Sequence, residues 1–149
     1  MSTQTAAAEL RQILTDYCNG CNHTKNHDIE ILKNLISKVS DDQRYELLSS
    51  ILGYYRETVL TGAARRGHTE LCVTLLSSLP PADRLKLILV DNYTALHSAA
   101  YWGRTETVSG ILNCLTADQQ LQLLFTQESY GNTALHDAAR WGHTETVKT

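Results

Sequence analysis

The residues best suited to bind a metal lie in one short run near the N-terminus. Thiolate and imidazole groups are the usual ligands of tetrahedral zinc sites. Zinc-binding sequences separate their two ligand pairs by about a dozen residues, which lets the chain wrap the metal. Here one residue separates Cys21 from His23, and the strand-helix context of a redox Cys-x-x-Cys motif is missing. We therefore interpret the run as a polar loop between helices and expect no bound metal. Its four members are Cys18, Cys21, His23 and His27.

Two further histidines could transfer protons near neutral pH. His97 and His136 each stand three residues after a threonine, Thr94 and Thr133, in the same surrounding sequence. A histidine that recurs with a fixed threonine is typical of a structural hydrogen bond repeated from unit to unit. The chain has no Gly-x-Ser-x-Gly motif, no glycine-rich phosphate loop and no pair of acids outside expected helix starts. The sequence therefore predicts no catalytic residues, no enzyme activity and no cofactor.

The sequence around His97 is repeated along the chain. Residues 94–106, Thr-Ala-Leu-His-Ser-Ala-Ala-Tyr-Trp-Gly-Arg-Thr-Glu, return in close form at 133–145 and in looser form at 58–70. Similar segments at a nearly constant spacing indicate stacked structural repeats. The equivalent glycines are 36 and 39 residues apart, at Gly67, Gly103 and Gly142.

Helices are expected to build these repeats. Apolar residues recur every three or four positions, and the alternation of a half-buried strand is absent. Acidic, hydroxyl or proline residues stand where several of these helices should begin, as expected of caps and first turns. The expected helices are residues 8–18, 28–38, 43–54, 80–89, 94–102, 105–115 and 116–125.

We divide the chain into a short tail and one repeat domain. Residues 1–7 are small and polar, and we expect them to be disordered. The repeat domain covers residues 8–149. Its parts are an N-terminal capping and degenerate repeat at 8–57, repeats at 58–93 and 94–132, and a partial C-terminal repeat at 133–149.

The composition excludes several classes of partner. The 149-residue chain has a formal net charge of -3 and no basic stripe, so no nucleic-acid partner is expected. No apolar run approaches the roughly 18 residues that span a bilayer, so no membrane partner is expected. The N-terminus has neither the basic start nor the apolar core of a secretory signal. Cys72 and Cys114 occupy apolar helical positions, where thiols pack as small hydrophobes, and we expect a reducing, cytoplasmic location.

The repeated segment resembles the ankyrin repeat, whose signature is Thr-Pro-Leu-His-x-Ala followed by a glycine that ends the first helix. Residues 133–145 match closely, and residues 94–106 match nearly as well, with Arg104 where the family prefers histidine. In residues 58–70, Thr61 replaces the signature histidine. The resemblance implies an all-α, ankyrin-type helical repeat solenoid whose Thr–His pairs tie neighbouring repeats together. The family period is about 33 residues, so the longer spacing here predicts an extra third helix in each repeat.

The resemblance also implies a binding surface. In the family, the residues before the helix-ending glycine, the residue after the histidine and the loop residues line a concave groove. Tyr, Trp and Arg dominate binding hot spots, and the arginines here suggest a partner with acidic or aromatic groups. Trp102 and Trp141 could instead pack against the next repeat. The implied partner-binding residues are Arg65, Arg66, Tyr93, Ser98, Tyr101, Trp102, Tyr130, Asp137, Arg140 and Trp141, and Gly62, Asn92, Ser129 and Asn132 occupy the same set of positions.

The function that the resemblance implies is non-catalytic protein-protein interaction through the concave groove. Alternatively, the chain is a structural repeat segment of a larger scaffold or bacterial effector whose activity lies outside it. The last repeat stops partway through its second helix, at Thr149, which would leave an apolar face uncovered. Self-association through this truncated C-terminal repeat is therefore a further expectation.

Overall fold

The computed structural model describes residues 3–18, 26–50 and 56–149. These residues form helices and no strands, as the apolar spacing predicts. The helices are α1 (Thr3–Cys18), α2 (Asn26–Ser37), α3 (Asp41–Ser50), α4 (Val59–Arg66), α5 (Thr69–Ser77), α6 (Pro81–Ile88), α7 (Ala95–Tyr101), α8 (Thr105–Asn113), α9 (Ala117–Leu124), α10 (Ala134–Arg140) and α11 (Thr144–Lys148).

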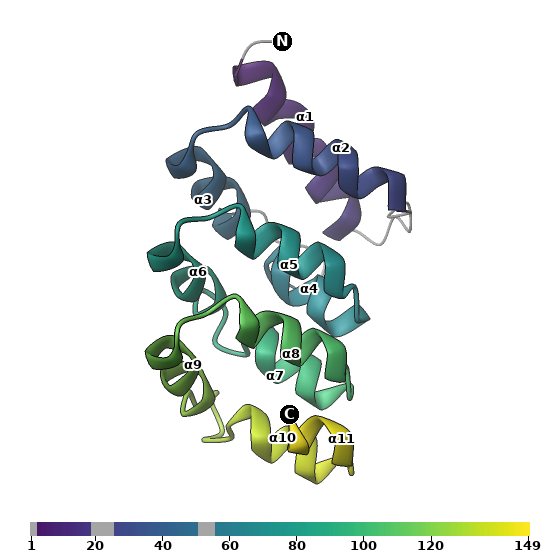
Figure 1. Ribbon diagram of the computed structural model, residues 1–149, viewed down its shortest axis with the longest axis vertical. Coiled ribbons are helices and arrows are strands. Elements are labelled where there is room, and N and C mark those ends of the chain that lie inside the picture. Colours follow the sequence, from purple (N-terminus) through teal and green to yellow (C-terminus); the bar gives the residue numbers. More distant parts are fainter. Residues whose placement is uncertain (1–2, 19–25, 51–55) are drawn as a thin grey trace.

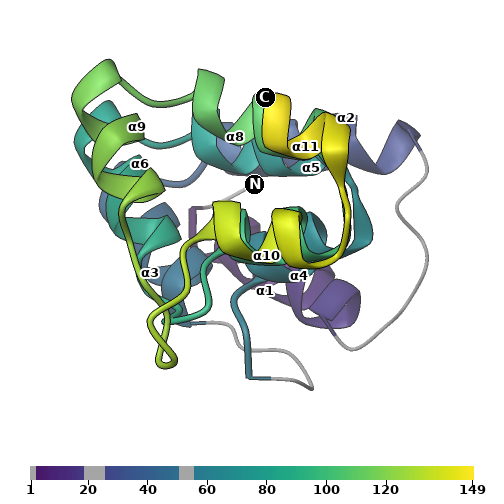
Figure 2. The ribbon, with the colours of Figure 1, turned by 90° about the horizontal axis from the view of Figure 1, so that it is seen from below.

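The helices stack in three columns (Figure 1). An inner column contains α1, α4, α7 and α10, and an outer column contains α2, α5, α8 and α11. The third column, α3, α6 and α9, stands to one side of both when the stack is viewed along its length (Figure 2). Within the columns, α4 packs against α1 and α7, α5 against α2 and α8, and α3 against α6. The predicted all-α solenoid with a third helix per repeat is confirmed.

The N-terminal segment differs from the prediction. Residues 1–7 are predicted to be disordered, but α1 begins at Thr3, so the prediction is wrong for residues 3–7. Alanine has the highest intrinsic helix propensity, and Ala6 is fully buried in the same cluster as Leu10 and Leu14. The start of α1 is therefore helical, and Ala6 packs into the core.

Threonine and histidine together start the inner helices. Thr94 Oγ1 accepts a hydrogen bond from the backbone N–H of His97 (3.3 Å), and His97 Nδ1 accepts one from the backbone N–H of Thr94 (3.3 Å). Thr133 and His136 make the same pair of bonds at the start of α10. This is a capping box with histidine in the place of glutamate or glutamine. The Nδ1 atoms of His97 and His136 therefore cap the inner helices.

A glycine follows each of the inner helices α4, α7 and α10, and its backbone conformation explains why. Gly67, Gly103 and Gly142 have φ values of 75°, 66° and 71°, in the left-handed region that other residues rarely adopt. At Gly103, moreover, a Cβ atom would lie 2.6 Å from Nδ1 of His143 in the next repeat. The glycine thus permits both the turn and the close approach of the following repeat.

Hydrogen bonds tie the inner helices α4 and α7 to the loop of the next repeat. His97 Nε2 lies 3.0 Å from the carbonyl oxygen of Asn132. Where Thr61 replaces the histidine, Asp91 makes the link instead. Its Oδ2 accepts from Thr61 Oγ1 (2.7 Å) and from the Oγ1 (3.0 Å) and backbone N–H (2.9 Å) of Thr58. A carboxylate from the following loop has therefore replaced the imidazole, and the degenerate repeat keeps its connection.

Arginines anchor the third column. Arg44 of α3 donates to a carbonyl near the end of α2 (2.8 Å) and to the carbonyl of Ser78 at the end of α5 (2.8 Å). Arg84, at the equivalent position of α6, donates to a carbonyl after α5 (3.0 Å) and to that of Cys114 at the end of α8 (3.0 Å). The last carbonyls of a helix have no partner within the helix. Each guanidinium therefore connects the outer helix of its own repeat to that of the next.

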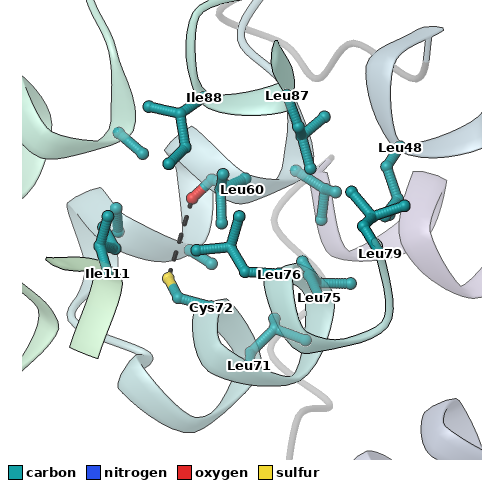
Figure 3. Packing of buried hydrophobic residues seen from close by; sticks show 14 of the residues in the cluster. Leu48, Leu60, Leu71, Cys72, Leu75, Leu76, Leu79, Leu87, Ile88 and Ile111 are labelled. Atoms are coloured by element: carbon teal, nitrogen blue, oxygen red, sulfur yellow. Dashed lines mark hydrogen bonds between the residues drawn. The ribbon is translucent and has the colours of Figure 1, made fainter. Parts of the chain in front are cut away.

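Leucine and isoleucine side chains from all three columns form the core. Leu60 of α4, Leu76 of α5 and Leu87 of α6 meet in one cluster (Figure 3). Cys72 lies in the same cluster, with its Sγ 3.9 Å from the carbonyl oxygen of Leu60. Burial raises the pKa of the Cys72 thiol to about 12, so the thiol stays neutral. Cys72 packs as a small hydrophobe, as predicted.

Two of the excluded features can be examined in the described part of the chain. No helix there has the length and apolar character needed to cross a membrane. Among the same residues, no three His, Cys, Asp or Glu side chains form a group that could hold a metal ion. Cys18 belongs to α1 and His27 to α2, so the interpretation of the run as a loop is wrong at its two ends. Cys21 and His23 lie outside the described residues, and for them it stays a prediction.

Candidate functional site

A groove of about 610 Å³ lies between the ends of the inner helices and the loops that precede them. The loop before α10 projects from the inner column (Figure 2). Its residues Glu128, Tyr130 and Asn132 line the groove. Ser98, Tyr101 and Trp102 line the groove from α7 and its C-terminal cap, and Asp137 and Arg140 line it from α10. The groove therefore draws its side chains from consecutive repeats.

Most of the predicted binding residues meet in this groove. Asn132, at one of the same positions, lines it too, whereas Asn92 and Ser129 are hydrogen-bonded to each other outside it. Side chains that lie far apart in the sequence thus meet because equivalent repeat positions stack. The predicted residues in the lining are Arg65, Tyr93, Ser98, Tyr101, Trp102, Tyr130, Asp137 and Arg140.

Two lining residues escaped the prediction. Glu57 stands directly before the threonine that caps α4, as Tyr93 does before α7, so the repeat register alone could have identified it. Glu128 has no such signal, because it belongs to the longer loop before α10. Its Oε1 accepts hydrogen bonds from the backbone N–H groups of Tyr130 and Asn132, both at 2.9 Å. Glu128 therefore shapes the loop and leaves its other carboxylate oxygen outside these two bonds.

Arg66 does not line the groove, which corrects the prediction. Its Nη1 donates to the carbonyl oxygen of Tyr17 (3.0 Å), and its Cζ lies 4.8 Å from the centre of the Tyr17 ring. Successive residues of a helix point about 100° apart, so Arg66 cannot share the direction of Arg65. It faces α1 and holds the first two inner helices together.

The two tryptophans are half-exposed, so neither is a fully buried core residue, and their packing against the next repeat stays a prediction. Trp102 is 53% exposed and Trp141 is 51% exposed. The Tyr101 ring lies between them, with centroid distances of 5.2 Å to Trp102 and 5.1 Å to Trp141. Trp102 lines the groove, whereas Trp141 supports Tyr101 from the next repeat and is absent from the lining. The three rings therefore form one aromatic cluster on the inner column.

Two charged residues of the groove differ in their partners: Arg65 is paired with a carboxylate, whereas Asp137 is bonded to a neutral hydroxyl. Arg65 donates from Nη2 (2.8 Å) and Nε (3.0 Å) to Glu57 Oε1, which makes a two-pronged ion pair. Asp137 is only 6% exposed, and its Oδ2 accepts a hydrogen bond from the neutral hydroxyl of Tyr93 (3.0 Å). Burial raises the pKa of Tyr93, and the negative charge of Asp137 raises it further. The phenol therefore remains a hydrogen-bond donor to Asp137.

The position after each helix-ending glycine connects the repeats on this side. Arg104 Nε donates to the carbonyl oxygen of Arg65 (3.2 Å), and His143 Nε2 lies 2.8 Å from that of Tyr101. These carbonyls belong to equivalent residues, two positions before the preceding glycine. Arg104 thus performs the structural role of the histidine that it replaces, and both contacts hold the backbone below the groove in place.

The sequence matches models of two described protein families. A family described as "Ankyrin repeats (3 copies)" matches residues 21–122, and one described as "Ankyrin repeat" matches residues 130–149. The chain belongs to the ankyrin repeat family. Its departures from the family signature are therefore variations within ankyrin repeats, with Asp91 compensating for Thr61 and the arginines anchoring the additional helices.

Solved structures show the same fold. A chain in the crystal structure of the yeast ribosomal protein Rps3 in complex with its chaperone Yar1 superposes with a TM-score of 0.62 at 20% sequence identity. The match covers 98% of the present chain and 88% of that chain. No curated protein matches the sequence. At this identity the likeness establishes the ankyrin architecture alone.

Proposed function

We propose that this ankyrin repeat protein is a non-catalytic binding module that takes a segment of a partner protein into the groove. Ankyrin repeats generally mediate protein-protein interaction. The observation that carries the proposal is the set of aromatic rings, Tyr93, Tyr101, Trp102 and Tyr130, that line a groove of about 610 Å³. Exposed aromatic residues of this kind are the usual anchors of protein interfaces.

The chemistry of the lining also favours binding. Ser98 is its one aliphatic hydroxyl among the described residues, and no hydrogen bond between described residues joins that hydroxyl to Glu57, Glu128 or Asp137, the carboxylates that could serve as its base. Nucleophilic catalysis needs such a base within hydrogen-bond reach. The Rps3–Yar1 crystal structure, which is that of a protein-protein complex, accords with a binding role.

The proposal is tested by replacing the ring that lines the groove. Trp102→Ala should reduce the capture of partner proteins by about tenfold or more, because a central aromatic anchor contributes 2 kcal/mol or more. The unfolding transition should change little, since Trp102 is half-exposed. Affinity capture from a lysate, quantified against wild type, measures the first, and urea denaturation the second.

Phe125→Ala is the matched control. Phe125 is an exposed aromatic residue at the end of α9 and is not part of the groove lining. If both variants retain the partners that wild type captures, the groove is not the binding surface. A large loss of stability in Trp102→Ala would likewise contradict the proposal, because it would make the tryptophan a core residue.

A further inference from the structure

We propose that the groove accepts a basic segment of the partner protein and holds one lysine or arginine side chain between the rings of Tyr93, Tyr101 and Trp102 and the carboxylates of Asp137 and Glu128. The inference rests on the proposed function and specifies the chemistry of the partner. It reverses the expectation that the arginines of the groove select an acidic partner.

The arginines are largely committed to other contacts. Arg65 is paired with Glu57 at 2.8 Å, and Arg66 lies against Tyr17 outside the groove. Arg140, which is exposed, is the remaining arginine of the described lining, and the same lining contains the two carboxylates of Asp137 and Glu128. The pairing of Glu57 with Arg65 therefore leaves an excess of negative charge, which would repel an acidic segment or a phosphate backbone.

Asp137 is the strongest indication that the groove binds a cationic side chain. Its carboxylate is buried, yet it takes part in none of the ion pairs among the described residues, and its hydrogen-bond donor is a neutral phenol. Burying a carboxylate without a counter-ion is unfavourable, so an ammonium or guanidinium group in the groove would compensate it. Asp137 is one of the residues that line the hollow, so a cation held there would lie near its carboxylate.

The aromatic walls suit the same ligand. The faces of Tyr and Trp rings carry partial negative charge and attract cations positioned over them. Tyr101 is held by Trp102 and Trp141, and Tyr93 is held by its bond to Asp137 and by the His97 ring at 5.2 Å. Because neighbouring side chains already fix these rings, a ligand would lose little free energy in ordering them.

The chemistry can be tested with three small probes that differ in one group. Nα-acetyl-lysine methylamide and its arginine counterpart carry the cation, and the norleucine counterpart has an apolar side chain without charge. The chain has two tryptophans, so the two indole N–H signals in ¹H–¹⁵N spectra report separately on Trp102 and Trp141. We expect saturable shifts of the Trp102 signal with both cationic probes, which weaken as salt is added, and none with norleucine.

A charge-removing variant locates the effect. Asp137→Asn keeps an oxygen that accepts from Tyr93 but removes the charge, and it should weaken binding of the lysine probe about tenfold or more. Asp118→Asn, at an exposed aspartate of α9 outside the groove, should leave binding unchanged. Glu128→Gln gives a second charge-removing variant should Asp137→Asn fail to fold.

Several outcomes would overturn the inference. These are equal binding of the norleucine and lysine probes, no saturable shift with either cationic probe, and unchanged lysine binding in folded Asp137→Asn and Glu128→Gln variants. The two proposals fail separately. If Trp102→Ala abolishes partner capture while the probes show no preference for cations, the groove binds protein and only the basic chemistry is wrong. If Trp102→Ala has no effect on capture, the proposed function itself is wrong.

Discussion

Asp91 should be the residue on which the degenerate repeat depends. Its Oδ2 accepts three hydrogen bonds, from the backbone N–H and Oγ1 of Thr58 and from Oγ1 of Thr61, and both threonines are buried. In Asp91→Ala the two hydroxyls can still satisfy each other, since they lie 3.3 Å apart. The N–H of Thr58 loses its side-chain acceptor, and the charge-assisted bonds disappear. Each buried group left unsatisfied costs about 1–3 kcal/mol, so we expect Asp91→Ala to lower the free energy of unfolding by about 2–4 kcal/mol.

Restoring the signature histidine should offset part of this loss. In the next repeat the histidine reaches the carbonyl of Asn132, the residue before a capping threonine, and the equivalent residue here is Tyr93. Thr61→His in the Asp91→Ala background could make the corresponding bond to the Tyr93 carbonyl. The double variant should therefore be more stable than the sum of the two single changes, by about 1 kcal/mol or more.

Urea denaturation of wild type, both single variants and the double variant measures this coupling. Glu46→Ala, at an exposed position of α3, is the control and should change the unfolding free energy by no more than about 0.5 kcal/mol. A loss for Asp91→Ala no larger than that of the control would refute the argument that the carboxylate replaces the histidine. Strict additivity of the two changes would refute the proposed equivalence of the two links.

Three other predictions address packing, pH and assembly. Gly103→Ala should lower the free energy of unfolding by at least about 1 kcal/mol more than Gly131→Ala does, because both glycines have positive φ but only Gly103 is crowded by the next repeat. Equal losses of unfolding free energy in urea denaturation would contradict this. Burial, and secondarily two nearby arginines, lower the pKa of His68 below 6.5. The unfolded chain therefore binds this proton more readily than the folded chain, so the free energy of unfolding should fall as pH drops from about 7 to 5. His68→Gln should make this pH dependence less steep. An unchanged pH dependence in the variant would exclude His68 as its source. We also propose self-association through the C-terminal repeat, where Leu135 is 56% exposed. Leu135→Glu should abolish any concentration-dependent rise in mass by sedimentation, and a wild type that stays monomeric would rule the surface out.

Local interactions explain what could be predicted from the sequence. Thr94 and His97 are three residues apart, and the capping box that they form needs only one helical turn. The left-handed turn at Gly103 likewise depends on one residue type at one position. The surplus length between repeats, filled by an N-capped apolar segment, was sufficient to predict the third helix. The helices and most of the groove lining follow from such short-range patterns.

The direction and pairing of side chains across repeats were decided by the tertiary structure. Arg65 and Arg66 are adjacent in the sequence, yet one pairs with Glu57 at the groove and the other packs on Tyr17. Glu57 lies eight residues from Arg65, whereas Arg66 meets Tyr17, 49 residues away, because of the offset and rotation of neighbouring repeats, which the local sequence does not encode. The same stacking brought Tyr93 to Asp137, 44 residues away, and left Asp137 buried and in none of the ion pairs among the described residues. The sequence by itself thus determined the ankyrin architecture and most positions that line its groove, whereas the partners of Arg66 and Asp137 were decided only when distant repeats came into contact.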